Sequence, residues 1–111
     1  MTDVLHTVAS VFGNTIRVTA RQWAHIAEAH DYMSGNMDKI LETLGEPGRV
    51  IAGKRGESLA LRDYDSTNIT RKTAVVVYRD EDDGFLITAF FTSKPEKIEQ
   101  RGQVLWSSQE N

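Results

Sequence analysis

The chain offers histidine, arginine, lysine, tyrosine and threonine side chains for chemistry, and it has no cysteine among its 111 residues. Disulfides, thiol catalysis and cysteine-ligated zinc are therefore excluded. His25 and His30 are five positions apart, about 140° out of line around a helix, so they do not form the i, i+4 pair of a zinc-binding helix. No glycine-rich phosphate loop and no nucleophile motif follow a strand. We therefore expect chemistry without a metal or a cofactor.

The remaining residue types are those that RNA cleavage without a metal requires. A base must take the proton of the 2′-hydroxyl, and an acid must protonate the leaving 5′-oxygen. Cations or hydroxyl donors must stabilise the charge on the phosphoryl oxygens. The candidate site residues are His25, His30, Arg62, Tyr64, Lys72, Arg79, Thr88 and Thr92.

Two strands joined by an acidic turn are the most regular elements that could position these residues. The runs at 73–78 (TAVVVY) and 85–91 (FLITAFF) are β-branched or aromatic, which favours strands. The turn at 80–84 ends in Asp-Gly, a pair that is typical of an antiparallel hairpin. Alternation along the second strand predicts one set of side chains facing the helices and another on an open face. The two sets are Phe85, Ile87, Ala89 and Phe91, and Leu86, Thr88, Phe90 and Thr92.

Two helices are expected before this hairpin. Thr19 occupies an N-cap position, with Gln22 as its capping-box partner, and such a cap contributes about 1 kcal/mol. The apolar stripe of the first helix, at 20–33, ends on His30. Asn36 begins a second helix that stops at Gly45.

Further short strands complete the pattern. Residues 50–52 and 58–64 indicate strands joined across the turn at 53–57, and Arg62 and Tyr64 share one face of the second. The other expected elements are an edge strand or N-terminal arm at 4–12, a helical turn or two at 95–101 and a short strand at 104–106. We expect a single domain over 1–111, with the arm or edge strand at 1–15, the core at 16–106 and a frayed tail at 107–111.

Charge is unevenly spread along the chain, whose net charge is −3. Residues 49–79 hold seven basic and three acidic residues, which gives +4, whereas 1–48 and 80–111 carry −3 and −4. The basic middle could face phosphates, although nucleic-acid binders are usually basic overall. The apolar runs are too short to cross a bilayer, and the first residues lack a signal-peptide layout. We therefore expect a cytoplasmic protein that does not contact a membrane.

The order of the motifs resembles a known nuclease group. A helix with WAHI and a following histidine is succeeded by a helix ending in LGEP, a basic strand, the VVVY strand and the LITAF strand. This order, over 16–106, is similar to that of the phage-type nucleases of the barnase–EndoU–colicin–RelE superfamily, and also to that of the BrnT toxins. The resemblance implies an α+β fold with N-terminal helices packed on one face of a four-stranded antiparallel sheet. It also implies metal-independent RNA cleavage on the open face.

The resemblance implies roles for individual residues. The family pattern places a catalytic helix histidine at His25 or His30, a basic strand residue at Arg62 and a hydroxyl at Thr88. The other candidates, taken from the residue types and their strand positions and not from the resemblance, are the substrate-binding residues Tyr64, Lys72, Arg79 and Thr92. BrnT-like chains carry an arginine two residues after the hydroxyl, and this chain has Phe90 there.

Two functions follow from these observations. One is a metal-independent endoribonuclease of a toxin or phage system, with RNA as its substrate and an antitoxin or immunity protein as a further partner. The other is a non-catalytic RNA- or protein-binding module on the same fold. The histidine, arginine and threonine set favours the enzyme, whereas the net acidity and Phe90 favour the binding module.

Overall fold

The computed structural model describes residues 3–68 and 70–108. Within these ranges it is an α+β protein with seven strands and three α-helices, and no helix there is long and apolar enough to cross a bilayer. The strands are β1 (Val4–Ala9), β2 (Thr15–Thr19), β3 (Arg49–Ala52), β4 (Ser58–Tyr64), β5 (Lys72–Arg79), β6 (Gly84–Thr92) and β7 (Val104–Ser107). The helices are α1 (Ala20–Ala29), the short 3-10 helix Asp31–Met33, α2 (Met37–Gly45) and α3 (Pro95–Glu99).

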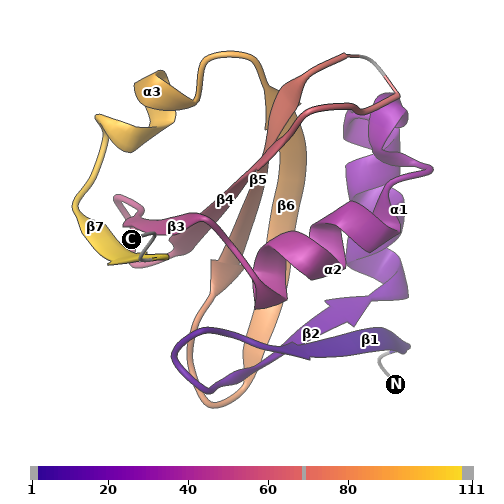
Figure 1. The fold of residues 1–111 in the computed structure, drawn as a ribbon. Helices are drawn as coiled ribbons and strands as arrows, with labels where there is room; N and C mark the ends of the chain where they lie inside the picture. Colours follow the sequence, from indigo (N-terminus) through magenta and orange to yellow (C-terminus); the bar gives the residue numbers. More distant parts are fainter. Residues whose placement is uncertain (1–2, 69, 109–111) are drawn as a thin grey trace.

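All the described strands form one mixed sheet in the order β1-β2-β6-β5-β4-β3-β7 (Figure 1). The prediction of a four-stranded antiparallel sheet with N-terminal helices packed on one face is therefore wrong. Ile16 and Val18 are fully buried, so the segment before the first helix pairs as a strand, β2. It runs parallel to β6 through Ile16 with Gly84 and Arg17 with Phe85. Two additional strands, β1 and β7, extend the sheet at its two ends.

The predicted antiparallel hairpin is confirmed, because β5 pairs with β6 along its length. The register shifts between Val77 and Tyr78, where β6 accommodates one extra residue, Ile87. A bulge of this kind reverses the faces of the residues before it. Leu86 is therefore buried opposite Tyr78, whereas Phe85 is 36% exposed. Strict alternation thus predicts the faces correctly after the bulge and wrongly before it.

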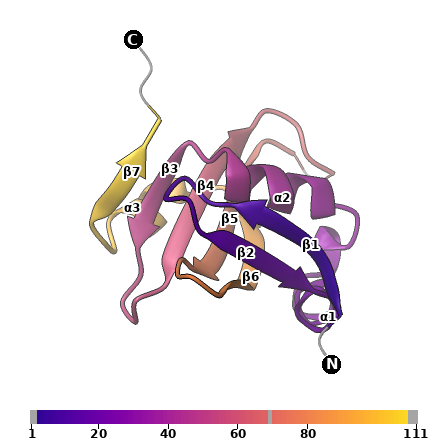
Figure 2. The same cartoon turned by 90° about the horizontal axis from the view of Figure 1, so that it is seen from below.

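One face of the sheet is covered by α1 and α2 (Figures 1 and 2). Ile26 of α1 and Leu44 of α2 pack against Val76 and Ala89 in the main hydrophobic core. All four side chains are fully buried. Burial of a side chain such as Ile26, Leu44 or Val76 stabilises a fold by about 1.5–3 kcal/mol, so this interface holds the helices on the sheet. We call this side the helix-covered face.

The helix α1 also covers the edge of β6 that β2 leaves unpaired. The hydroxyl of Thr19 accepts a hydrogen bond from the backbone N–H of Gln22 at 3.2 Å, which confirms the predicted N-cap. The Gln22 side chain does not return to Thr19 as a capping box requires. Its amide nitrogen instead donates to the carbonyl oxygen of Ile87 in the bulge. The expected first helix is also shorter, because α1 ends at Ala29 and a 3-10 turn follows.

The opposite side is the open face, and it has a smaller core of its own. Leu61 and Val75 are buried there under Ile98 of α3, with Val77 and Phe90 packed beside them. Figure 2 shows α3 beside β3 and β7, at the end of the sheet far from the β1–β2 hairpin. Among the described helices, α3 therefore covers the open face at one end only.

The C-terminal segment is more ordered than its polar sequence predicts. The expected short strand at 104–106 is confirmed as β7, which pairs with β3. Ser107 belongs to this strand, and the backbone N–H of Ser108 donates to the Gly48 carbonyl at 2.9 Å. The prediction of a frayed tail is therefore wrong for these two serines, while its part at 109–111 lies outside the described residues.

Candidate functional site

Arg62 lies on the helix-covered face, away from the candidate hydroxyl of Thr88. Its strand partner is Ala74, which belongs to the core under the helices, whereas Thr88 pairs with Val77 of the open face. Its guanidinium donates to the carbonyl oxygen of Glu46 at 2.5 Å. The structure therefore does not place Arg62 and Thr88 around one cleft.

Tyr64 lies beside Arg62 and is held by α2. Its hydroxyl donates to the Glu42 carboxylate at 2.6 Å, and its ring lies 5.8 Å from the Arg62 guanidinium. Burial and the hydrogen bond to Glu42 raise the pKa of Tyr64 to about 12. Because this hydroxyl is engaged by the fold and holds its proton tightly, its contacts are those of a structural residue.

His30 is the candidate that reaches the open face. It follows α1 directly, is half-buried, and its ring centroid lies 5.9 Å from that of Phe90. Its Nδ1 lies 3.4 Å from the Tyr32 hydroxyl. Thr88 and Thr92 flank Phe90 on the same face of β6. A histidine and two threonines therefore share one edge of the open face, which we call the histidine edge.

His25 projects from α1 as an exposed side chain. Lys72 stands opposite Tyr64 in the β4–β5 pairing. A cavity of about 350 Å³ at this end of the sheet brings together Tyr64, Lys72 and Thr92. Three candidate substrate-binding residues thus share a cavity, and His25 does not line it.

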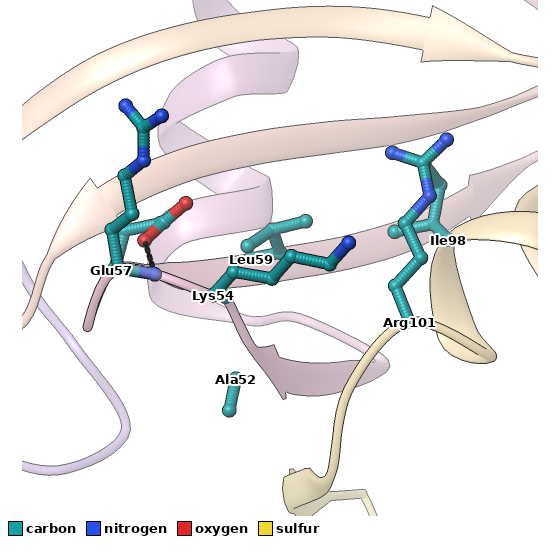
Figure 3. A pocket seen from close by; sticks show the side chains of 8 residues that line it. Ala52, Lys54, Glu57, Leu59, Ile98 and Arg101 are labelled. Carbon is teal, nitrogen blue, oxygen red and sulfur yellow. Dashed lines mark hydrogen bonds between the residues drawn. The ribbon is translucent and has the colours of Figure 1, made fainter.

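A larger cavity, of about 450 Å³, lies on the open face between the β3–β4 turn and α3 (Figure 3). Its apolar side chains are Ala52, Leu59 and Ile98, and its charged lining residues are Lys54, Arg55, Glu57 and Arg101. We call it the basic pocket. The three cations are exposed, and none forms an ion pair with a carboxylate in the described part of the chain. Sequence reasoning missed these residues, although the basic excess at 49–79 was the signal for two of them.

Glu57 fixes the turn that carries two of the cations. Its carboxylate accepts a hydrogen bond from the backbone N–H of Arg55 at 2.8 Å, shown dashed in Figure 3. Backbone hydrogen bonds, together with the nearby Arg79 and Arg55 charges, lower the pKa of Glu57. Gly56 has a φ of +86°, and a Cβ there would lie 2.8 Å from Nη1 of Arg79. Arg79, a candidate substrate-binding residue, therefore lies over this turn, next to the basic pocket.

A charge network holds α3 over the sheet and so shapes the pocket. The Arg49 guanidinium is 2.5 Å from the Glu99 carboxylate of α3 and 3.2 Å from that of Asp63 on β4. Thr73 donates to the same Asp63 carboxylate at 2.7 Å. Arg49 of β3 thereby links β4 to α3. Because α3 is held in this position, Arg101, just beyond its end, lies at the pocket.

The basic pocket and the histidine edge lie in one row of residues that runs across the strands of the sheet. Leu59, which lines the pocket, pairs with Val77, and Val77 pairs with Thr88. Neighbouring strands are about 4.8 Å apart, so Leu59 and Thr88 are separated by about 10 Å. An extended polyanion lying across the strands would contact cations at one end and the histidine edge at the other.

No metal-binding cluster is present among residues 3–68 and 70–108, since no three histidine or carboxylate side chains there lie close enough to hold an ion. Comparison of the chain with family models, with curated proteins and with solved structures gives no match. The nuclease resemblance therefore depends on the sequence motifs alone, and the candidate function depends on the geometry described above.

Proposed function

We propose that the protein is an endoribonuclease that binds single-stranded RNA across the open face and cleaves it at the histidine edge. The observation that carries the proposal is the position of His30, 5.9 Å from the Phe90 ring, on the face where Thr88 and Thr92 also lie. Histidine is the side chain that most often transfers protons in enzymes. The nucleophile is the neighbouring 2′-hydroxyl, and the reaction needs no metal.

The open face supplies the other groups that this reaction requires. The hydroxyl of Thr88 can donate to a phosphoryl oxygen, as a preorganised donor does for charge that develops in a transition state. Arg79 and the cations of the basic pocket offset the charge of the adjoining phosphates. Phe85 and Phe90 present aromatic side chains, on which unpaired bases stack in many RNA-binding proteins.

The first test is cleavage of a labelled single-stranded RNA by purified protein. We expect His30→Gln to lower the rate by about 10²-fold or more, because general acid–base catalysis contributes that much. His25→Gln is the matched control and should leave the rate unchanged, since His25 is exposed and makes none of the ring contacts with Tyr32 and Phe90 that hold His30. Equal losses in the two variants would contradict the assignment of His30.

Two further arms test the mechanism. Cleavage should persist in excess chelator, and it should stop when the nucleotide on the 5′ side of the cut carries a 2′-deoxy sugar. Cutting of the deoxy substrate would show that the 2′-hydroxyl is not the nucleophile. Loss of activity with chelator, restored by added metal, would contradict the metal-independent mechanism.

A cellular role as a cytoplasmic toxin or phage-type nuclease is part of this proposal, and an antitoxin or immunity protein would then be the partner. Induced expression of the wild type should arrest growth, whereas His30→Gln at equal abundance should not. Growth arrest by both proteins would show that the toxicity does not depend on cleavage by His30, and would contradict this role.

The second candidate function is RNA or protein binding without cleavage. It is favoured by Arg62, whose contacts with Glu42 and Glu46 keep it on the helix-covered face. The histidine edge therefore lacks the strand arginine that the family pattern expects. Saturable RNA binding without any cut product would support this candidate and exclude the first.

A further inference from the structure

We propose that the basic pocket binds the phosphomonoester of a nucleotide, with the base resting on the apolar floor of the pocket. The ligand can come from the phosphorylated end of an RNA or from a free mononucleotide, and the chemistry that recognises it is the same. The inference rests on the proposed function only for the RNA source, because binding of a mononucleotide requires no cleavage.

Charge is the first argument. The lining residues carry three cations, Lys54, Arg55 and Arg101, and one carboxylate, Glu57, whose pKa is lowered so that it stays ionised. The lining therefore has a net charge of +2. A phosphomonoester carries about −1.5 to −2 at neutral pH, whereas a phosphodiester within an RNA chain carries −1. The pocket thus complements a terminal phosphate better than an internal one.

Shape is the second argument. A volume of about 450 Å³ falls within the range of about 300–1,000 Å³ that small-molecule sites occupy. Ala52, Leu59 and Ile98 supply apolar contacts that a base can use and inorganic phosphate cannot. In Figure 3 the Lys54 side chain extends past Leu59 toward Arg101, and the Arg101 side chain extends alongside Ile98, so that both cations lie next to apolar side chains. Such a pocket distinguishes a nucleotide from a bare anion.

Position is the third argument. Leu59 at the pocket and Thr88 at the histidine edge are two strands apart in one row of the sheet. A terminal phosphate in the pocket would therefore place a linkage close to that end at the histidine edge. The proposed nuclease should accordingly prefer cuts near a phosphorylated end.

The test is a calorimetric titration of the protein with four ligands, each used separately. They are adenosine monophosphate, its 3′,5′-cyclic diester, adenosine and inorganic phosphate. We expect the monophosphate to saturate one site and to bind about tenfold or more tightly than each of the other three. Equal binding of the monophosphate and the cyclic diester would overturn the charge argument. Equal binding of inorganic phosphate would overturn the role of the floor.

Substitutions locate the site. Arg101→Gln and Lys54→Gln should each weaken binding of the monophosphate about tenfold or more. Lys97→Gln is the matched control, because Lys97 is exposed on α3, the helix that precedes Arg101, and does not line the pocket. An equal loss in Lys97→Gln would mean that only the general charge of the protein attracts the ligand, and would overturn the proposal.

Competition then identifies the source of the ligand. Short RNAs with a 5′- or a 3′-phosphate should displace the monophosphate, and the same RNAs with hydroxyl ends should not. If neither phosphorylated RNA competes while the monophosphate still binds, the free mononucleotide is the ligand. His30→Gln should leave monophosphate binding unchanged, so failure of cleavage and failure of this inference are distinguishable.

Discussion

At the residue scale, Arg62 shows how a side chain of catalytic type can serve the fold. Its guanidinium joins β4 to α2 through the Glu46 carbonyl at 2.5 Å and the Glu42 carboxylate at 3.4 Å. Its Nε is buried without a hydrogen-bond partner among the described residues. These contacts fix the side chain to the helix and leave it little freedom to meet a substrate.

We therefore expect Arg62→Ala to lower the free energy of unfolding by about 1.5–3 kcal/mol, the range for hydrogen bonds that involve a charged group. The rate of RNA cleavage by the folded variant should be close to that of the wild type. Urea denaturation measures the first quantity. Arg71→Ala is the control, since its side chain is 80% exposed and exposed substitutions usually change stability by no more than about 0.5 kcal/mol. A large loss of cleavage with unchanged stability would return Arg62 to the active site.

Tyr64 predicts a dependence of stability on alkaline pH. Its pKa rises from 10.0 to about 12 on folding, through burial and its hydrogen bond to Glu42. The folded chain therefore holds this proton more tightly than the unfolded chain. The contribution to stability is fully present below pH 10 and is lost as the pH rises through about 12. Burial raises the pKa of Tyr78 in the same direction.

Urea denaturation at several pH values above and below 10 measures this effect. The slope of stability against pH between 10 and 12 should become shallower in Tyr64→Phe, with the remaining slope attributable in part to Tyr78. Parallel curves for the variant and the wild type would contradict the assignment to Tyr64.

The sequence predicted site residues in strands better than those in turns. Thr88 was placed on the open face because side chains alternate along a strand, and it does lie there. Lys54, Arg55 and Arg101 lie in a turn and after a short helix, where no period tells which way a side chain points. Their convergence depends on the docking of α3, a contact between segments about 45 residues apart that no local pattern encodes.

At the scale of elements, the connection from α3 to β7 passes unusually close to β3. A Cβ on Gly102 would lie 2.0 Å from the carbonyl oxygen of Ala52, and the Ala52 N–H donates to the Gln103 carbonyl at 2.8 Å. Only a residue without a side chain allows this approach. Gly102 thereby sets the position of its neighbour, Arg101, at the basic pocket.

We expect Gly102→Ala to lower stability by about 1–3 kcal/mol, as overpacking does, and to weaken binding of adenosine monophosphate. Gly35→Ala is the matched control, because nothing lies within 4 Å of a Cβ there. Thermal denaturation and calorimetric titration measure the two effects. If the two glycine variants behave alike, the close approach does not position Arg101.

Two errors at this scale have a common physical cause. The segment Thr15–Thr19 was read only as the approach to a helix cap, and β6 was expected to alternate strictly. Both features depend on partners distant in sequence: β2 is stabilised by its pairing with β1 and β6, and the bulge at Ile87 by the Gln22 side chain of α1. The helix cap and the central hairpin are local features, and both predictions were confirmed.

At the scale of the whole molecule, the predicted fold failed in the number and direction of strands. The β3–β4 and β5–β6 hairpins were predicted correctly because each is formed by neighbouring segments, whereas the β1–β2 hairpin was not predicted. The parallel pairing of β2 with β6 joins residues 68 positions apart, Ile16 and Gly84. Nothing in the composition of either strand selects the other, so the sequence pattern alone could not predict a mixed sheet.

Besides this short pairing, the carboxylates of Asp80 and Asp83 tie the N-terminal hairpin to the β5–β6 turn, that of Asp83 through Arg17 at 3.2 Å. Asp80 accepts hydrogen bonds from the Ser10 hydroxyl at 3.0 Å and the Asn14 amide at 2.7 Å. We expect Asp80→Ala to cost about 1–3 kcal/mol, because two donors lose their acceptor. In Asp80→Ala, the backbone amide hydrogens of β1 and β2 should exchange faster than in the wild type, and those of β4 and β5 should change less. Glu81→Ala, exposed in the same turn, is the control, and an equal effect there would argue against a specific tie.

This connectivity has a consequence for synthesis on the ribosome. The β1–β2 hairpin is made before the other strands of the sheet, and the strand that receives β2 is made 68 residues later. At about 5–20 residues per second, roughly 3–14 s pass before β6 is available to pair with β2, and Ile16 and Val18, which are fully buried in the folded protein, lack that cover. The nascent chain therefore exposes an unpaired, apolar strand edge for seconds, and a chaperone that shields β1 and β2 during translation would raise the yield of native protein.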